Sequence, residues 1–412
     1  MSLYSFPKSN KLFERAAARI PGGIPGHQSP ALTVPGAFPY FAERAQGCRY
    51  WDVDGNEFID FMCGYGPIVL GYNHPKVEAA AAAQRERGFC FNHPSERTVE
   101  LAEKLCDIIP IADWAVFARN GSDITTWSLQ VAREHTQRNK VIMARGAYHG
   151  THAWCTPGHG GLTMEDTNNV LMFTWNNADE IRDLIIKNDK DVAAIILTPY
   201  HHPAFGDSVL PAPGFYQAVR SICDEYGIVM IIDDVRAGFR LNMGGSSEYF
   251  GGKADMICYS KAIANGYTLS AGVGRKELKN AAGRVFFTGS FWSSPVELAA
   301  SLATIDEMLA TNAIDKMLRM GKMLQDGLKQ RGEAHGLQVS VTGPPSIPNM
   351  TFANETNFRR MQRFSAECSL RGVFFHPHHN WFISAAHEEA DIKKGLDIAD
   401  EAFAIVKKEF GS

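Results

Sequence analysis

The stretch that decides the fold is IVMIID at residues 228–233, an apolar run that ends in a carboxylate. A second apolar run, ADMICYS at residues 254–260, is followed directly by Lys261. Each run has the length and composition of a buried strand. A strand that ends in a charged residue delivers that charge to one edge of a sheet, where ligands bind in open α/β folds. We therefore expect Asp233 and Lys261 to lie at a ligand-binding edge.

An amine and a carboxylate delivered in this way suit pyridoxal phosphate. The lysine would form a Schiff base with this cofactor, and the aspartate would keep the pyridine nitrogen protonated so that the ring accepts electrons. A buried ion pair, or a lysine that caps a strand end, would leave the same pattern in the sequence. The pair alone does not separate these alternatives.

Size and composition limit the class of protein. The chain has 412 residues and 45% hydrophobic content, enough for one large core or for a large and a smaller domain. The net charge is −4, with no basic patch for nucleic acid, and no apolar stretch reaches the roughly 18 residues of a membrane span. The N-terminus lacks a signal-peptide core, and the eight cysteines form no C-x-x-C pair. We expect buried thiols, no metal, no nucleic-acid or membrane partner, and a cytoplasmic location.

Helices and strands alternate from about residue 97 onwards. The pattern predicts helices at residues 97–109, 124–134, 177–188 and 214–226, and strands at 140–144, 192–197, 228–233 and 256–260. A capping box is predicted for Asn177 and Glu180, and another starts a long helix at SPVE, residues 294–297. This alternation predicts a largely parallel sheet with both faces covered by helices.

The domain organisation follows from changes in this pattern. Residues 1–60 are predicted to be an N-terminal segment that contributes to the small domain, 61–300 the large cofactor-binding domain, and 301–412 a small α+β domain. Residues 48–61 predict a hairpin that turns at DGN, residues 54–56. The C-terminal region predicts strands at 338–341, 349–352 and 381–384, a helix at 356–371 and an amphipathic terminal helix.

A candidate phosphate site lies at RNGSD, residues 119–123, just before a predicted helix. Backbone N–H groups at a helix start, with a glycine and small polar side chains, form an anion site, so Asn120, Gly121 and Ser122 are candidates. A plain N-cap would use the same residue types. Tyr148 and His149 follow the strand predicted at 140–144, where an aromatic ring would stack on the cofactor or simply pack.

Together these segments resemble the class III (ω-)aminotransferases of the fold-type I pyridoxal phosphate enzymes, and within them the glutamate-1-semialdehyde 2,1-aminomutase branch. The likeness runs along nearly the whole chain and keeps order and spacing. The matching motifs are PGG at 21–23, WDVDGN at 51–56, GYGP at 64–67, YHG at 148–150, DDVRAGFR at 233–240 and SAAH at 384–387. The DDVRAGFR stretch and the later lysine are highly specific as an ordered pair.

The resemblance implies a large domain with a central, mostly parallel sheet, a smaller α+β domain, and pyridoxal 5'-phosphate as cofactor. It implies that Lys261 binds the cofactor and shuttles a proton, and that Asp233 pairs with the pyridine nitrogen. Val235 and Tyr148 would pack on opposite faces of the ring, with His149 beside them. Asn120, Gly121 and Ser122 would hold the phosphate.

A further phosphate contact implied by the family comes from a neighbouring subunit. The family places a threonine there, and Ser290 takes its position in this sequence. A phosphate site that a second chain completes implies a homodimer with active sites at the interface.

Departures from the family pattern bear on the substrate. The aminomutases follow their early PGG with an arginine that binds the substrate carboxylate, whereas residues 24–29 here are IPGHQS. The amino-acid aldehyde is therefore not the expected substrate. We expect a polar, aromatic substrate pocket that includes Tyr65, His27, His201 and His378, and that suits a neutral amine or a hydroxylated carbonyl better than a dicarboxylate.

Three functions are weighed. The favoured one is an aminotransferase that moves an amino group from an amine or amino acid to an aldehyde or ketone by ping-pong chemistry. The second is an aminomutase or epimerase, which keeps the amine on one molecule, so that an external amino donor would not restore its activity. The third is a protein that keeps the fold but only binds or regulates, and intact Lys261 and Asp233 argue against it.

Overall fold

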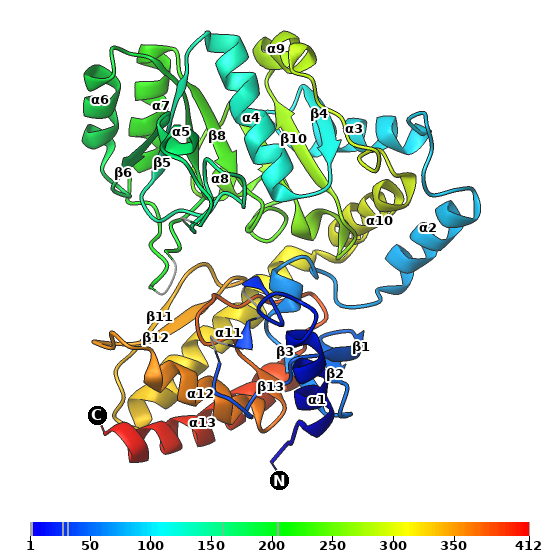
Figure 1. The fold of residues 1–412 in the computed structure, drawn as a ribbon, viewed down its shortest axis with the longest axis vertical. Coiled ribbons are helices and arrows are strands. Elements are labelled where there is room, and N and C mark those ends of the chain that lie inside the picture. The colour runs from blue at the N-terminus through cyan, green and yellow to red at the C-terminus, as the bar shows by residue number, and fades with distance from the viewer. Residues whose placement is uncertain (1–2, 27–28, 31–32, 159, 204–205, 412) are drawn as a thin grey trace. The chain divides into compact units, whose positions relative to one another are not determined.

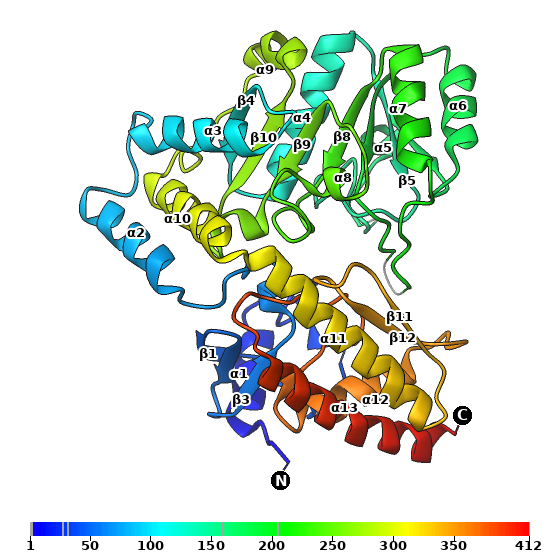
Figure 2. The same ribbon diagram turned by 180° about the vertical axis from the view of Figure 1, so that it is seen from behind.

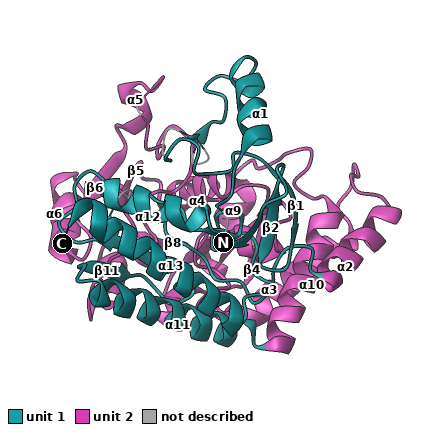
Figure 3. Cartoon of the chain, turned by 90° about the horizontal axis from the view of Figure 1, so that it is seen from below, with its two compact units in different colours: residues 1–74, 204–207, 312–412 teal, residues 75–203, 208–311 magenta. Residues whose placement is uncertain are grey.

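The computed structural model describes residues 3–26, 29–30, 33–158, 160–203 and 206–411. The chain divides into two compact units (Figure 3): unit 1 comprises residues 1–74, 204–207 and 312–412, and unit 2 comprises residues 75–203 and 208–311. Domain boundaries were predicted after residues 60 and 300. The second of these falls inside helix α10 (Pro295–Thr311), which packs on α2 and α3 and stays in unit 2.

Unit 2 is built on a seven-stranded sheet with the order β4-β10-β9-β8-β7-β5-β6 (Figure 1). The strands are β4 (Trp114–Ala118), β5 (Lys140–Ala144), β6 (Val170–Phe173), β7 (Val192–Leu197), β8 (Val229–Asp233), β9 (Met256–Tyr259) and β10 (Ser270–Gly274). Strand β10 runs antiparallel to both of its neighbours, and all other pairs are parallel. Strands β7, β8 and β9 are buried along their whole length, as apolar runs require. The mostly parallel sheet is therefore confirmed.

Helices cover both faces of this sheet. The helices of unit 2 are α2 (Pro75–Glu86), α3 (Glu96–Ile108), α4 (Gly121–Thr136), α5 (Met164–Thr167), α6 (Ala178–Lys187), α7 (Phe215–Tyr226), α8 (Ser246–Tyr249), α9 (Lys279–Arg284) and α10. Helix α4 lies across β7, β8, β9 and β10 on one face, and α7 covers the other, as the front and rear views show (Figures 1 and 2). Parallel crossovers are almost always right-handed, so connections that run in opposite directions along the sheet place their helices on opposite faces.

The capping box predicted at Asn177 is only half formed. The Asn177 side chain accepts a hydrogen bond from the Glu180 N–H (3.2 Å) at the start of α6. The Glu180 carboxylate, however, accepts from the Thr174 N–H (2.7 Å) instead of from the cap residue. The turn before the helix brings Thr174 into reach, which the residue spacing alone does not reveal.

Unit 1 combines helices with two small sheets, so its α+β character is confirmed. One sheet has the order β1-β2-β3-β13, and the other pairs β11 with β12. The strands are β1 (Ala42–Gln46), β2 (Arg49–Asp52), β3 (Glu57–Asp60), β11 (Val339–Thr342), β12 (Asn349–Phe352) and β13 (Val373–Phe374). The helices are α1 (Pro7–Ala17), α11 (Ala313–Ala334), α12 (Arg359–Ser369) and α13 (Glu389–Phe410). The hairpin predicted at 48–61 is β2–β3.

The strand predicted at residues 381–384 is wrong. The segment is extended, but its N–H groups bond to two different segments: Trp381 and Ile383 donate to the Pro348 (2.8 Å) and Ser346 (3.0 Å) carbonyls, and Phe382 donates to the Phe61 carbonyl (2.7 Å). These bonds are divided between two neighbouring segments, and residues 381–384 form no strand of a sheet. None of the helices in the described ranges is long and apolar enough to cross a membrane.

Candidate active site

Asp233 and Lys261 lie at the ends of neighbouring strands. Asp233 ends β8 and stands opposite Cys258 of β9 in the parallel pairing. Lys261 follows Cys258 by three positions and begins a short 3-10 turn, Lys261–Ala264. The Asp233 side chain is buried, whereas Lys261 is half-buried. The sheet therefore brings the two predicted catalytic residues together at its carboxyl edge, where open α/β folds bind ligands.

Lys261 has an unusual backbone and a perturbed amine. Its φ of 51° is in the left-handed region, which a residue with a Cβ adopts only when its surroundings enforce it. Burial lowers the pKa of Lys261 to about 7, and the neighbouring Arg236 guanidinium acts in the same direction, against Asp233. A substantial fraction of the amine is therefore neutral at neutral pH, the form that attacks a carbonyl.

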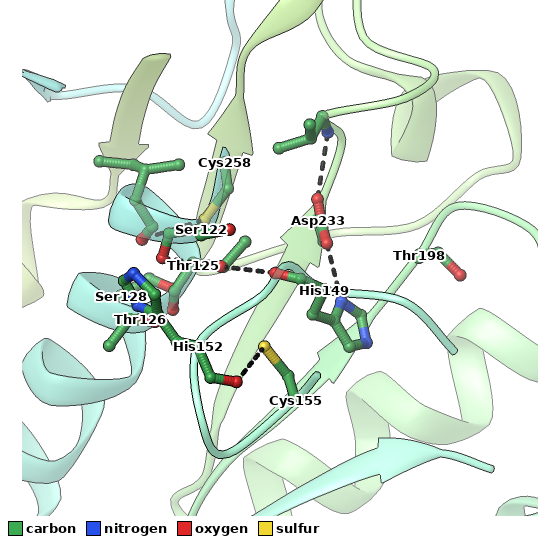
Figure 4. A network of polar contacts seen from close by, with 12 residues as sticks. Ser122, Thr125, Thr126, Ser128, His149, His152, Cys155, Thr198, Asp233 and Cys258 are labelled. Atoms are coloured by element: carbon green, nitrogen blue, oxygen red, sulfur yellow. Dashed lines mark hydrogen bonds and ion pairs between the residues drawn. The ribbon is translucent and has the colours of Figure 1, made fainter. Parts of the chain in front are cut away.

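Asp233 is held from two sides (Figure 4). Its Oδ1 accepts a hydrogen bond from the Val235 N–H (3.1 Å), and its Oδ2 lies 2.7 Å from His149 Nδ1. His149 is buried and stacks on Trp154 with ring centroids 6.0 Å apart. These contacts fix the direction of the carboxylate. The structure thus makes His149 a partner of Asp233, a role that the sequence did not suggest.

The start of helix α4 forms a cradle beside these residues. A Cβ on Gly121 would lie 2.9 Å from Val235 Cγ1, so only glycine lets the helix start approach the loop after β8. Gly150 has a φ of 131°, and a Cβ there would lie 2.5 Å from Ser122 Oγ. Ser122 Oγ in turn accepts from the Thr151 N–H (3.0 Å). The helix start, the segment after β5 and the loop after β8 therefore meet at one place.

These groups match the chemistry of pyridoxal phosphate. A partly neutral amine suits its aldehyde, and a fixed carboxylate suits its pyridine nitrogen. The start of a sixteen-residue helix, with Gly121 and Ser122 half-buried and Asn120 exposed, suits its phosphate. Tyr148 is half-buried next to His149. The residues present therefore fit the cofactor.

The remaining predicted residues lie on segments of both units. Ser290 is exposed in the loop between α9 and α10. His201 follows β7 and stacks on Trp175, with ring centroids 5.7 Å apart. His27 lies outside the described residues. In unit 1, the Tyr65 ring meets His376 and His379 at 5.8 and 5.4 Å.

His378, the other predicted residue of unit 1, faces different neighbours. Its ring meets Phe358 at 5.2 Å, and its Nε2 lies 3.1 Å from Gln362 Nε2. Tyr65 and His378 are therefore placed in distinct surroundings within the unit.

Sequence reasoning missed Arg236 and Trp175. Arg236 interacts electrostatically with Lys261, Asp233 and Tyr148. It stands inside the DDVRAGFR motif, three positions after Asp233 and directly after Val235, and this position was a usable signal. Trp175 follows β6, and nothing in the sequence relates it to His201, 26 positions later.

The fold and this placement of lysine, aspartate and helix start define a pyridoxal-phosphate transferase of fold type I. Residues 33–398 match the family model described as Aminotransferase class-III. The chain therefore belongs to the class III aminotransferases, and it is an enzyme that uses pyridoxal phosphate, as predicted.

Individual relatives also support membership of the class III aminotransferases. The chain is 41% identical to the aminopentol aminotransferase of Sphingopyxis macrogoltabida, over 98% of this chain and 96% of that one. It is 32% identical to the glutamate-1-semialdehyde 2,1-aminomutase of Syntrophobacter fumaroxidans, over 97% and 98%. Its fold matches the FumI protein of Sphingopyxis sp. MTA144, solved in its PLP internal aldimine form, with a TM-score of 0.96, 41% identity and 98% coverage of both chains. The aminomutase alternative is thus the weaker one.

The role of Arg236 can be tested through cofactor uptake by the apoenzyme. Replacing Arg236 by methionine removes a positive charge near Lys261, so the pKa of the amine rises and less of it is neutral at pH 7. We expect uptake of pyridoxal phosphate at pH 7 to slow several-fold, and the midpoint of its pH profile to move to higher pH. Stopped-flow absorbance checks this.

The matched control for that experiment is Arg145→Met, because Arg145 is an exposed arginine of the same unit. It should leave the midpoint unchanged. If the profile of Arg236→Met has the wild-type midpoint, Arg236 does not set the basicity of Lys261.

Proposed function

We propose that this aminotransferase takes its amino group from a hydroxylated amine without a carboxylate rather than from a dicarboxylic amino acid, and passes it to an aldehyde or ketone. The observation that carries the proposal is the cluster of aromatic and imidazole rings that follows β6 and β7. There Trp175 stacks on His201, and Tyr200 meets His202 at 5.4 Å. Burial lowers the pKa of His201, with a smaller effect from His149, so its imidazole stays neutral at pH 7.

These rings offer stacking and hydrogen bonds. The positive charges that act on Tyr200 are those of Arg236 and the fully buried Arg240. Arg236 acts more strongly on Lys261 than Arg240 does, and its guanidinium suits the single carboxylate of a 2-oxo acid acceptor. The similarity to an aminopentol aminotransferase supports the same substrate class, since its name denotes an amine that carries hydroxyl groups.

In this proposal each residue at the carboxyl edge of the sheet has a separate role. Pyridoxal phosphate, when bound, supplies an electron sink for the bond to the substrate α-carbon. Lys261 would carry a proton to and from the reacting carbon, which its lowered pKa permits. Asp233 would hold the proton of the pyridine nitrogen, with His149 keeping the carboxylate in line. Asn120, Gly121 and Ser122 would bind the phosphate, and Val235 and Tyr148 the two ring faces.

A panel of amines tests the substrate class. The holoenzyme should absorb at roughly 400–430 nm and lose this band toward roughly 330 nm when a productive donor is added. We expect hydroxylated primary amines to cause this change and glutamate to leave the band in place. Bleaching by glutamate alone would contradict the proposal. A coloured protein that ignores every external amine would instead favour the aminomutase, which the 32% identity to such enzymes keeps as the second candidate.

We also propose that the enzyme is a homodimer in which Ser290 serves the active site of the partner. Exposed rings lie in the segment of Ser290 and in a segment linked to it: Phe286 is 88% exposed, and Phe89 and Phe291 about two-thirds exposed, at 65% and 64%. The two segments that carry them are linked, because Ser294 Oγ lies 2.7 Å from the Phe89 carbonyl. Apolar surface of this kind marks an interface.

The proposal includes a cytoplasmic location, supported by eight cysteines that form no disulfide, all of them described.

Subunit complementation tests the shared site. Lys261→Ala and Ser290→Asp are each expected to be inactive alone. In a mixed dimer, the subunit with native Lys261 would receive native Ser290 from its partner. Random exchange should therefore restore about a quarter of the wild-type activity. A monomer in sedimentation, or no recovery after mixing, would contradict the shared site.

A further inference from the structure

Unit 1 contains a ring-lined cavity of about 520 Å³ that no part of the proposed mechanism uses. It lies beside β1 and the 3-10 turn Cys63–Tyr65. Its aromatic lining includes Phe38, Tyr50, Tyr65, Tyr72 and Phe374. The volume is within the range of small-molecule sites, and the lining is mostly apolar, as in such sites.

A buried carboxylate stands in the wall of this cavity. Asp60 is 2% exposed; its Oδ1 accepts from the Met62 N–H (2.7 Å), and its Oδ2 accepts from the Cys63 N–H (3.0 Å) and the Tyr72 hydroxyl (2.7 Å). Because both oxygens accept, these bonds favour the charged carboxylate. Within the described ranges, no lysine or arginine forms an ion pair with it. Burial raises the pKa of Asp60, which reflects the cost of a charge without a counter-ion.

Other charges in the lining do not compensate Asp60. The Arg44 guanidinium lies over the Trp51 ring, 3.6 Å from its centroid. His376 Nδ1 accepts a hydrogen bond from the His378 N–H (3.1 Å), and an acceptor nitrogen carries no proton. His376 is therefore an uncharged ring in the wall of the cavity.

The turn that presents Tyr65 is strained. Cys63, Gly64 and Tyr65 have φ values of 49°, 62° and 66°, three successive residues in the left-handed region. Two of them carry a Cβ, so this turn exists only because its surroundings enforce it, and the Asp60 carboxylate does so through two backbone N–H groups. Such strain concentrates at ligand-binding segments. Here it sets the Tyr65 ring edge-on to His376 and His379.

We propose that this cavity binds an organic ammonium ion, with the aromatic rings around the cation and Asp60 as its counter-charge. Rings bind cations through their negative faces, most strongly where water is excluded. The bound cation would also neutralise the buried carboxylate, which a neutral ligand could not do. The inference rests on the proposed function in one respect: amine substrates are ammonium ions at neutral pH and so belong to this ligand class.

Choline and 3,3-dimethylbutan-1-ol test the proposal, because they share shape and differ in charge. Neither carries a primary amine, so their binding is independent of transamination and of the proposed donor class. Calorimetric titration of the holoenzyme should give choline an affinity at least about tenfold higher than the alcohol. Equal affinities, or no binding of choline, would overturn the proposal.

Variants locate the binding site. Tyr65→Leu should weaken choline about tenfold and change the alcohol by no more than about twofold. Tyr249→Leu removes an exposed tyrosine outside the cavity and should affect neither ligand. Asp60→Asn should abolish the preference for choline, provided that its thermal unfolding shows a folded protein. Unaltered choline binding in Tyr65→Leu would exclude this cavity.

Discussion

Replacing Lys261 by alanine should lower transamination by at least about 10⁴-fold and leave the protein folded. The variant lacks both the amine that joins the cofactor and the group that moves the proton. Alanine tolerates the left-handed backbone as poorly as lysine does, so the turn itself should persist. The holoenzyme band at roughly 400–430 nm should be absent. Single-turnover kinetics and absorbance spectra measure both effects.

The control for this variant is Lys276→Ala, an exposed lysine at the opposite edge of the same sheet. It should retain wild-type kinetics and spectrum. Activity of Lys261→Ala within tenfold of wild type would show that another residue does this chemistry.

Replacing Asp233 by asparagine should lower the rate by about 10²- to 10³-fold while the holoenzyme band remains. The amide has the size of the carboxylate and can still accept from the Val235 N–H, but it loses the charge that stabilises a protonated pyridine. The fall should appear in kcat and persist at saturating donor. The exposed Asp179→Asn is the control and should have no effect.

A second variant shows whether His149 acts through Asp233. His149→Asn should lower kcat less than Asp233→Asn does, because the carboxylate keeps its charge but loses its 2.7 Å partner. In the double variant the two losses should not multiply, since the residues form one unit. Multiplicative losses would assign His149 a separate role.

The sequence was most informative where a residue's role depends on strand ends. Asp233 and Lys261 were placed correctly because apolar runs of strand length fix which residue emerges at the sheet edge. The same signal gave β5 and β7 with their observed bounds.

Contacts between segments that are distant in the sequence could not be predicted from the sequence pattern. The link between His149 and Asp233 spans 84 positions and depends on the order of strands in the sheet, which periodicity does not encode. The segment at 381–384 has the composition of a strand, but its hydrogen bonds are divided between residues 346–348 and Phe61. The hydrogen-bond partner of the Glu180 carboxylate is likewise decided by the path of the preceding turn and not by the capping-box motif. Local pattern thus identifies elements, while tertiary arrangement decides what their side chains touch.

The antiparallel strand β10 has a consequence for the order in which the protein folds. It pairs β4, at residues 114–118, with residues 270–274, so the edge of the sheet that precedes the Asn120 cradle closes only after most of unit 2 has been made. Pairing across such a separation is slow, and it falls late in folding. A cofactor that needs both this cradle and Lys261 binds only the finished sheet. When pyridoxal phosphate is present during synthesis, its binding therefore shifts the folding equilibrium toward the finished sheet by mass action. Scarcity of pyridoxal phosphate should reduce the yield of folded enzyme as well as its activity.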